Sequence, residues 1–267
     1  MQDKVILINY ANAIFRKSQI RNSYTGIEFG GFQEVISYAS KDIDSAFQAK
    51  NAAILKQEKG DGYFLWKPYF IKKTLALLSE GDFLFYCDSG SYFIDSVDDL
   101  VEFCKNKNQD IIPFELEHYE KYWTKRDAFL LMNCDTEEYY NTKQRLASFM
   151  LIRKSNYSCQ FVDDWLRFAE DERIVTDLEN QCGLDNYEGF IENRYDQTVF
   201  SLLTKKYEIP AYRDPSQFGT NLKDLYPDSK YKQFLIHTRK RNYPFYIEVR
   251  KYLRRKFVWI KQLLNLN

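Results

Sequence analysis

A short apolar run in the middle of the chain ends in a carboxylate. Residues 83–87 are FLFYC, and the next three positions hold Asp88, a serine and Gly90. Such a run predicts a strand buried on both faces. Because ligands of open α/β sheets bind outside the carboxyl ends of the strands, Asp88 stands where a metal ion or a substrate would bind. The same residues also fit a strand followed by an ordinary Asp-Ser-Gly turn, and this stretch alone does not decide between the two.

Further groups that could do chemistry lie late in the chain. Asp196 and Gln197 open a helix-compatible segment, and His237 follows a short apolar run, close to Arg239 and Arg241. A carboxylate, an amide and an imidazole can bind hydroxyl groups, phosphates or a metal ion. Each group also has an ordinary explanation, because Asp-Gln in a first helical turn can be plain capping and a histidine can be a satisfied core residue.

Lys67 belongs to an aromatic stretch, residues 60–70, with the sequence GDGYFLWKPYF. Pro68 suits the first turn of a helix, which places Lys67 near a helix N-terminus. Backbone N–H groups and the helix dipole favour anions there, so Lys67 is a candidate phosphate contact. The alternative is that the aromatic residues are core and the lysine is solvated.

Alternating apolar and helix-compatible segments would position these groups. Residues 4–9, 34–38, 111–114 and 148–154 predict strands, and Ser40 is expected to cap one long helix whose inner face includes Ile54. Alternation of strands and helices is typical of an α/β sheet with helices on its faces. We therefore expect a Rossmann-type mixed sheet flanked by helices.

Composition narrows the class of protein. The chain has 267 residues, of which 45% are hydrophobic and 17% aromatic, enough for a sizeable core. No apolar run approaches the about 18 residues of a membrane span, and residues 5–8 are too short for a signal peptide, so a cytoplasmic location is expected. The five cysteines are widely spaced without a CxxC pair, which argues against a disulfide framework or a zinc cluster. A formal net charge of zero argues against nucleic-acid binding.

Basic residues are concentrated at the end of the chain. Residues 244–266 predict an amphipathic helix with one apolar stripe and a basic surround. We therefore divide the chain into a main domain, 1–242, and a basic helix, 243–267. Such a helix suits peripheral binding to the inner, anionic face of a membrane, and it equally suits docking on the main domain with a solvated basic face.

Five segments occur in an order that is familiar from a known family: GDGYFLWKPYFI, LFYCDSGSYF, WTKRD, ENRYDQTVFSLL and FLIHTRKR. Together they resemble bacterial and viral glycosyltransferases of the GT-A fold, often encoded with capsule or O-antigen genes. The resemblance extends from Tyr10 to Arg241. The motifs are also similar to those of the retaining galactosyltransferase and glycogenin family.

The resemblance implies roles for individual residues. Asp88 would be the first acid of a DxD motif that, with His237, holds Mn²⁺ or Mg²⁺ on a nucleotide diphosphate. Asp196 and Gln197 would face the donor sugar. The second acid of the motif is Gly90 here, which puts the metal in question.

Without a metal, Lys67, Arg239 and Arg241 are the natural counter-charges for the diphosphate. Tyr10 and Ala11, at the end of the first strand, are expected to border the nucleotide base.

The expected activity is transfer of a sugar from a nucleotide-diphosphate sugar to a saccharide or lipid-linked saccharide of the cell surface. We expect a UDP-linked donor and favour retention of configuration at the anomeric carbon. A sugar nucleotidyltransferase is an alternative, although the Asn9–Asn12 sequence after the first strand lacks the usual glycine-rich basic loop. A carbohydrate-binding or membrane-scaffold protein without transfer activity is a second alternative.

Overall fold

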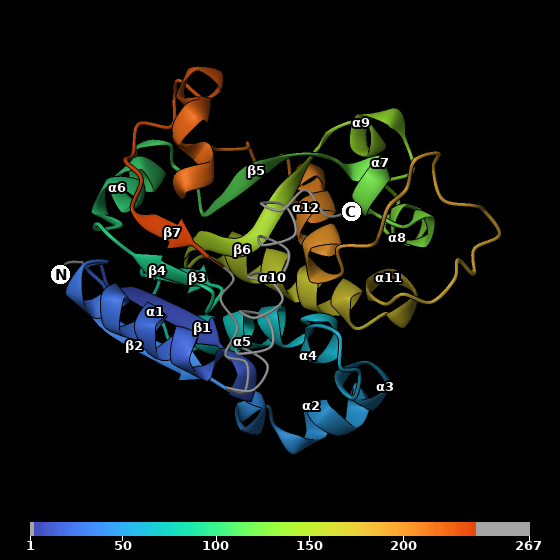
Figure 1. Cartoon of the computed structure of the whole chain (residues 1–267), viewed down its shortest axis with the longest axis horizontal. Coiled ribbons are helices and arrows are strands. Elements are labelled where there is room, and N and C mark those ends of the chain that lie inside the picture. Colours follow the sequence, from blue (N-terminus) through green and yellow to red (C-terminus); the bar gives the residue numbers. More distant parts are fainter. Residues whose placement is uncertain (1–2, 239–267) are drawn as a thin grey trace, which may run out of the picture.

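The computed structural model describes residues 3–238, which are arranged around a five-stranded mixed sheet (Figure 1). The strand order is β2 (Glu34–Tyr38), β1 (Val5–Tyr10), β3 (Phe83–Cys87), β6 (Lys143–Arg153) and β5 (Ile111–Tyr119). Strand β1 runs parallel to β2 and β3, whereas β6 is antiparallel to both β3 and β5. The predicted mixed α/β sheet flanked by helices is confirmed.

The central strands are apolar on both sides because both faces of the sheet are covered. In β1, Ile6 and Ile8 belong to one core cluster, and Val5 and Leu7 belong to the other. The first cluster lies under three helices: α5 (Trp66–Leu75), α10 (Asn156–Ala169) and α12 (Asp196–Lys206). This two-sided burial explains the continuous apolar runs in the sequence.

A smaller layer covers the opposite face. It contains α1 (Arg16–Glu28), α6 (Asp98–Asn106) and a two-stranded antiparallel sheet of β4 (Ser91–Phe93) and β7 (Leu235–His237). The short strand β4 follows β3 almost directly, so the small sheet brings the end of the described chain to the loop after β3. The 3₁₀ segments η1 (Ala13–Phe15) and η3 (Gln217–Leu225) complete this side.

The single long helix expected after Ser40 is instead three short elements: η2 (Ser40–Asp42), α2 (Ser45–Lys50) and α3 (Ala52–Leu55). The interruption has a local cause. Asp44 is extended, with φ −67° and ψ 153°, so that its carboxylate can accept a hydrogen bond from the backbone N–H of Phe47 and cap α2.

The remaining short helices are α4 (Gly60–Tyr63), α7 (Glu120–Trp123), α8 (Arg126–Leu131), α9 (Glu137–Tyr140) and α11 (Glu172–Val175). A long segment between α11 and α12 carries no helix or strand and runs along the edge of the molecule next to α8 (Figure 1). Within residues 3–238, no helix is both long and apolar enough to cross a bilayer. The expected basic helix at 243–267, and its boundary with the main domain, lie outside the described residues.

Candidate active site

Lys67 lies at the centre of a group of buried charges that come from distant parts of the sequence. Its ammonium nitrogen is 2.6 Å from Oδ2 of Asp196 and 3.8 Å from Oδ1 of Asp88. It also donates a hydrogen bond of 2.9 Å to the backbone carbonyl of Ala147 on β6. Lys67 is only 3% exposed. The structure therefore brings together three of the residues singled out in the sequence.

Aromatic rings surround the Lys67 ammonium on its other sides. The centroids of Tyr86, Phe64 and Trp66 lie 5.1, 5.2 and 6.0 Å from the nitrogen. The faces of such rings attract a cation, most strongly where water is excluded. The lysine charge is thus held by carboxylates on one side and by ring faces on the other.

Asp196 is the first residue of α12 and is 3% exposed. Burial raises the pKa of its carboxyl from 3.8 to about 6, against the opposing attraction of Lys67. Its Oδ2 atom accepts no well-aligned hydrogen bond, although the Lys67 ammonium is close. A buried carboxylate oxygen in this state gains stability when a ligand hydroxyl donates to it.

Asp88 follows β3 and is more accessible, with 26% of its side chain exposed. Its Oδ1 accepts a 2.5 Å hydrogen bond from the Tyr86 hydroxyl, and its backbone N–H donates to the carbonyl of Ser148. The next residue, Ser89, donates its hydroxyl to the carbonyl of Tyr10 at 2.5 Å. These bonds join the carboxyl ends of β1 and β3, which is where ligands of such sheets bind.

A hollow of about 370 Å³ opens beside the ends of β1 and β2. Its lining comprises Ala11, Asn12, Ala13, Arg16, Ser37, Ala39, Ser40 and Lys41. Ala11 lines this hollow; that it borders a nucleotide base stays a prediction. The ring of Tyr10 lies elsewhere: it stacks on Trp66 at 3.8 Å, its hydroxyl donates to Asp61, and burial and Asp61 raise its pKa.

Gln197 is held by neighbours within the protein. Its amide nitrogen donates to Oε1 of Gln144 at 2.7 Å, and its Oε1 accepts from the N–H of Ala147 at 3.3 Å. Gln144 in turn donates to Glu120 at 3.2 Å, and the fully buried Glu120 pairs with Lys205 at 2.7 Å. Gln144 and Glu120 carry no motif in the sequence, so their part in orienting Gln197 could not be anticipated.

His237 lies opposite Ser91 in the small sheet, and its ring is edge-on to Phe149 at 5.7 Å. The next residue, Thr238, donates its N–H to the carbonyl of Gly90 at 3.0 Å, so the histidine is next to the loop that bears Asp88. Arg239 and Arg241 lie outside the described residues.

The side chains around Asp88 do not by themselves form a complete set of metal ligands. Among residues 3–238, no cluster of three or more His, Cys, Asp or Glu side chains is arranged to hold a metal ion. The Tyr86 hydroxyl already occupies Oδ1 of Asp88, and the Lys67 ammonium is nearby. Among the described residues, Lys67 is the cation that pairs with Asp88.

The turn before Lys67 has an unusual backbone. Residues 60–64 have φ values of 59°, 56°, 90°, 52° and 63° in sequence order, all in the left-handed region. This conformation suits the two glycines, but it costs roughly 1–2 kcal/mol for each of Asp61, Tyr63 and Phe64. The indole N–H of Trp66 helps to hold the turn by donating to the Gly60 carbonyl at 3.0 Å.

Tyr195, directly before Asp196, is also strained, with φ 56° and ψ −120°. Its ring lies 5.2 Å from that of Tyr63 and 6.3 Å from that of Phe64. An ion pair of 2.9 Å between Lys59 and Asp177 lies at the same junction. The two strained segments that deliver Lys67 and Asp196 therefore pack against each other.

The WTKRD segment, residues 123–127, anchors the long irregular segment that ends at Asp196. The buried Asp127 carboxylate accepts hydrogen bonds from the backbone N–H groups of Gln181 and Cys182 at 2.6 and 3.1 Å. Lys125 donates to the carbonyl of Leu178, and burial lowers the pKa of this lysine. Spacing in the sequence left this motif open between an acceptor-side loop and a helical surface, and its contacts show that it holds the approach to α12.

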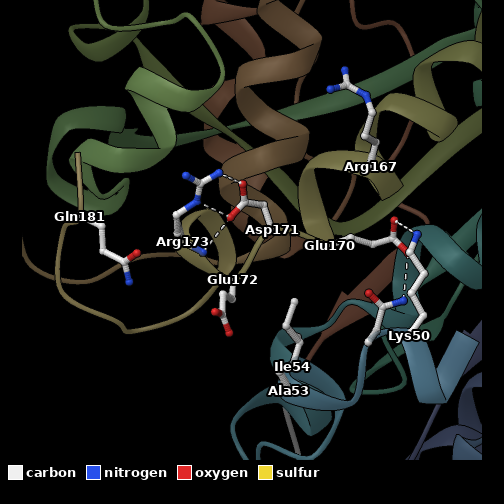
Figure 2. A pocket seen from close by; sticks show the side chains of 10 residues that line it. Lys50, Ala53, Ile54, Arg167, Glu170, Asp171, Glu172, Arg173 and Gln181 are labelled. Atoms are coloured by element: carbon white, nitrogen blue, oxygen red, sulfur yellow. Dashed lines mark hydrogen bonds and ion pairs between the residues drawn. The ribbon is translucent and has the colours of Figure 1, made fainter.

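A second hollow, of about 450 Å³, lies between α2–α3 and α10–α11 (Figure 2). Four of its charged side chains form two ion pairs. Lys50 contacts Glu170 at 2.8 Å and Arg173 contacts Asp171 at 2.6 Å, as the dashed lines in Figure 2 indicate. Lys67, Asp88 and Asp196 do not line it, so we place the candidate site at the strand ends instead.

The arrangement of sheet and helices is similar to that of a solved glycosyltransferase structure. WbbM, a bifunctional glycosyltransferase in its apo form, aligns with 91% of this chain and 47% of its own at 9% identity, with a TM-score of 0.52. Mouse xyloside xylosyltransferase 1, also in its apo form, aligns with 90% of this chain and 98% of its own at 10% identity, with a TM-score of 0.49. No protein-family model and no curated protein matches the sequence. At these identities the likeness concerns the fold alone.

Proposed function

We propose that this chain is a glycosyltransferase that moves a sugar from a nucleotide-diphosphate sugar to a saccharide acceptor. The observation that carries the proposal is the convergence of Lys67, Asp88 and Asp196 at the ends of β1 and β3. A mixed sheet shared with glycosyltransferase structures supports it. We place the nucleotide in the hollow beside Ala11, at the strand ends where ligands of such sheets bind.

Lys67 would stabilise the leaving group. When the bond between the anomeric carbon and the diphosphate oxygen breaks, negative charge develops on the diphosphate. An ammonium group has three donors, and Asp196 and the Ala147 carbonyl account for two close contacts. The third donor faces Asp88 at the longer distance of 3.8 Å, so a phosphate oxygen can take it.

Asp196 would bind the donor sugar as a hydrogen-bond acceptor. With a pKa of about 6 it is mostly ionised at neutral pH, and its carboxylate, which pairs with Lys67 through Oδ2, would also accept a hydrogen bond from a sugar hydroxyl. Gln197, held by Gln144, would fix the position of α12 next to the sugar. We favour a retaining outcome because of the Asp-Gln pair. A UDP donor and Mn²⁺ or Mg²⁺ bound by Asp88 and His237 remain predictions, to be tested by adding each ion to the metal-free protein.

The test uses a panel of sugar nucleotides with the purified full-length chain. We expect one of them to raise the melting temperature and to be hydrolysed slowly without an acceptor, because a ligand that binds only the folded state stabilises it. Asp88→Ala and Asp196→Ala should each abolish turnover. Asp88→Ala should cost little thermal stability, whereas Asp196→Ala leaves the buried Lys67 without its nearest counter-ion and should destabilise the fold. Asp163→Ala, which removes an exposed acid of α10, serves as the matched control and should keep full activity. Full activity in either site variant would remove that residue from the mechanism.

A cell-surface polysaccharide or lipid-linked oligosaccharide is the acceptor class we propose, with the basic segment 243–267 keeping the enzyme at an anionic membrane. Deleting residues 246–267 should release the protein from vesicles that contain anionic lipid while transfer to a soluble acceptor continues. Unchanged vesicle binding would show that this segment does not anchor the chain.

A further inference from the structure

Phe64 has a backbone conformation that is unfavourable for an aromatic residue. Its φ is 63° and its ψ is 17°, in the left-handed region where glycine and asparagine are far more common. Its ring also covers Gly60 so closely that a Cβ on that glycine would come within 2.4 Å of it. The turn is thus built around a ring that the local backbone disfavours, and strained residues of this kind concentrate at functional sites.

The ring borders the reaction centre described above. Its centroid is 5.2 Å from the Lys67 ammonium, and it stacks on Tyr195 with an angle of 23° between the ring planes. The neighbouring rings of Tyr63, Trp66 and Tyr195 are 8%, 5% and 7% exposed. Phe64, in contrast, is partly exposed and is the ring of this group that a ligand can reach.

We propose that Phe64 is the stacking platform for a sugar ring that binds beside the ion pair of Lys67 and Asp196. A pyranose is amphipathic: its hydroxyls form hydrogen bonds while its C–H groups form apolar patches that pack on aromatic faces. Asp196 and Lys67 supply the polar contacts, and Phe64 supplies the apolar face beside them. This inference rests on the proposed transferase function, and it assigns the apolar side of the sugar subsite.

The experiment compares three variants of the full chain. Phe64→Asn removes the ring and accepts the left-handed backbone, and Phe64→Tyr keeps an aromatic face. Glu208→Asn is the matched control, because Glu208 is exposed, has φ 54° and lies just after the end of α12, far along the chain from the turn. Affinity for UDP, affinity for the sugar nucleotide, hydrolysis without acceptor, transfer and melting temperature are measured for each variant.

We expect Phe64→Asn to melt within about 3 °C of the wild type, because relief of strain offsets the lost packing. Its affinity for UDP should be unchanged. If the platform holds the donor sugar, the affinity for the sugar nucleotide falls about fivefold to tenfold. If it holds the acceptor sugar, hydrolysis is unchanged and KM for the acceptor rises by a similar factor. Phe64→Tyr should restore either property, and Glu208→Asn should leave all of them unchanged.

Other results would overturn the inference. Unchanged affinities and rates in Phe64→Asn would show that no sugar touches the ring. A fall in melting temperature of ten degrees or more, on the order of several kcal/mol for a chain of this size, with equal loss of UDP and sugar-nucleotide binding, would show that the ring only supports the fold. If the wild type binds UDP but none of the sugar nucleotides, the platform is refuted while the nucleotide site stands. If it binds no nucleotide at all, the proposed function is refuted as well.

Discussion

Replacing Lys67 by methionine tests the electrostatics of the site most directly. Methionine keeps the length and apolar character of the side chain among three aromatic rings, but it removes the charge that lies 2.6 Å from Asp196. Asp196 would then be a buried carboxylate without its counter-ion. Breaking a buried ion pair from one side typically costs about 3–5 kcal/mol, because the remaining charge stays buried and uncompensated.

The pH dependence of that loss follows from Asp196. Its folded-state pKa is raised from 3.8 to about 6, so the folded state binds the proton more tightly than the unfolded state. Stability linked to this group is therefore fully present below pH 4 and is lost as the pH rises through 6. Lys67→Met raises the folded-state pKa further, so the loss grows and extends to higher pH. We expect a destabilisation of about 3–5 kcal/mol at pH 8 and of about 1–2 kcal/mol at pH 5, where Asp196 is protonated.

Urea unfolding of the wild type, Lys67→Met, Asp196→Asn and the double variant at pH 5 and pH 8 provides the measurement. Asp196→Asn in the Lys67→Met background should recover most of the loss at pH 8, because a neutral amide replaces the isolated charge. Equal destabilisation at both pH values, or no recovery in the double variant, would refute a buried ion pair between these side chains. Turnover should be absent from all three variants.

Three further predictions test other parts of the site. The transfer rate should rise with pH through about 6, where Asp196 ionises, and a pH–rate profile without that limb would exclude the carboxylate as a hydrogen-bond acceptor for the sugar. Gly62→Ala should lower the melting temperature more than Gly183→Ala, since both glycines have positive φ but only at Gly62 would the new Cβ approach backbone, at 2.8 Å from Leu55. Glu120→Gln leaves the buried Lys205 without its counter-ion and should cost about 3–5 kcal/mol in chemical unfolding, whereas a change within about 0.5 kcal/mol would show that the pair is not buried in solution.

The helices and strands that bear the site residues could be predicted from the sequence better than the contacts between those residues. The apolar run before Asp88 is β3, and Asp196 begins α12, as the local patterns indicated. Lys67 is near the start of α5, but its partners are carboxylates rather than solvent. Those pairings join residues more than 20 and more than 120 positions apart, and nothing in local periodicity encodes such distances.

Two other features had only faint signals in the sequence. Gly60 and Gly62 suggest a turn, but nothing marks Asp61, Tyr63 and Phe64 as left-handed, because side chains of these types normally avoid that conformation. The small sheet was also missed in part. The short apolar run before His237 is part of β7. Its partner β4 is three residues long and gains its stability from pairing with β7 and from packing of Phe93 against Phe32 and Phe85.

Strain and buried charge occur at the same place in this fold, and their coincidence is itself an argument for function. A chain selected for stability alone would hold asparagine or glycine at Phe64 and apolar residues at Lys67 and Asp196. Instead, the two strained segments before Lys67 and Asp196 pack against each other and bring these two charges into contact. Stability and activity should therefore be separable here: Phe64→Asn and the Lys67→Met, Asp196→Asn double variant stay folded while losing sugar binding or turnover. The matched change Glu208→Asn should leave sugar binding, turnover and melting temperature unchanged, which separates the active site from ordinary strain.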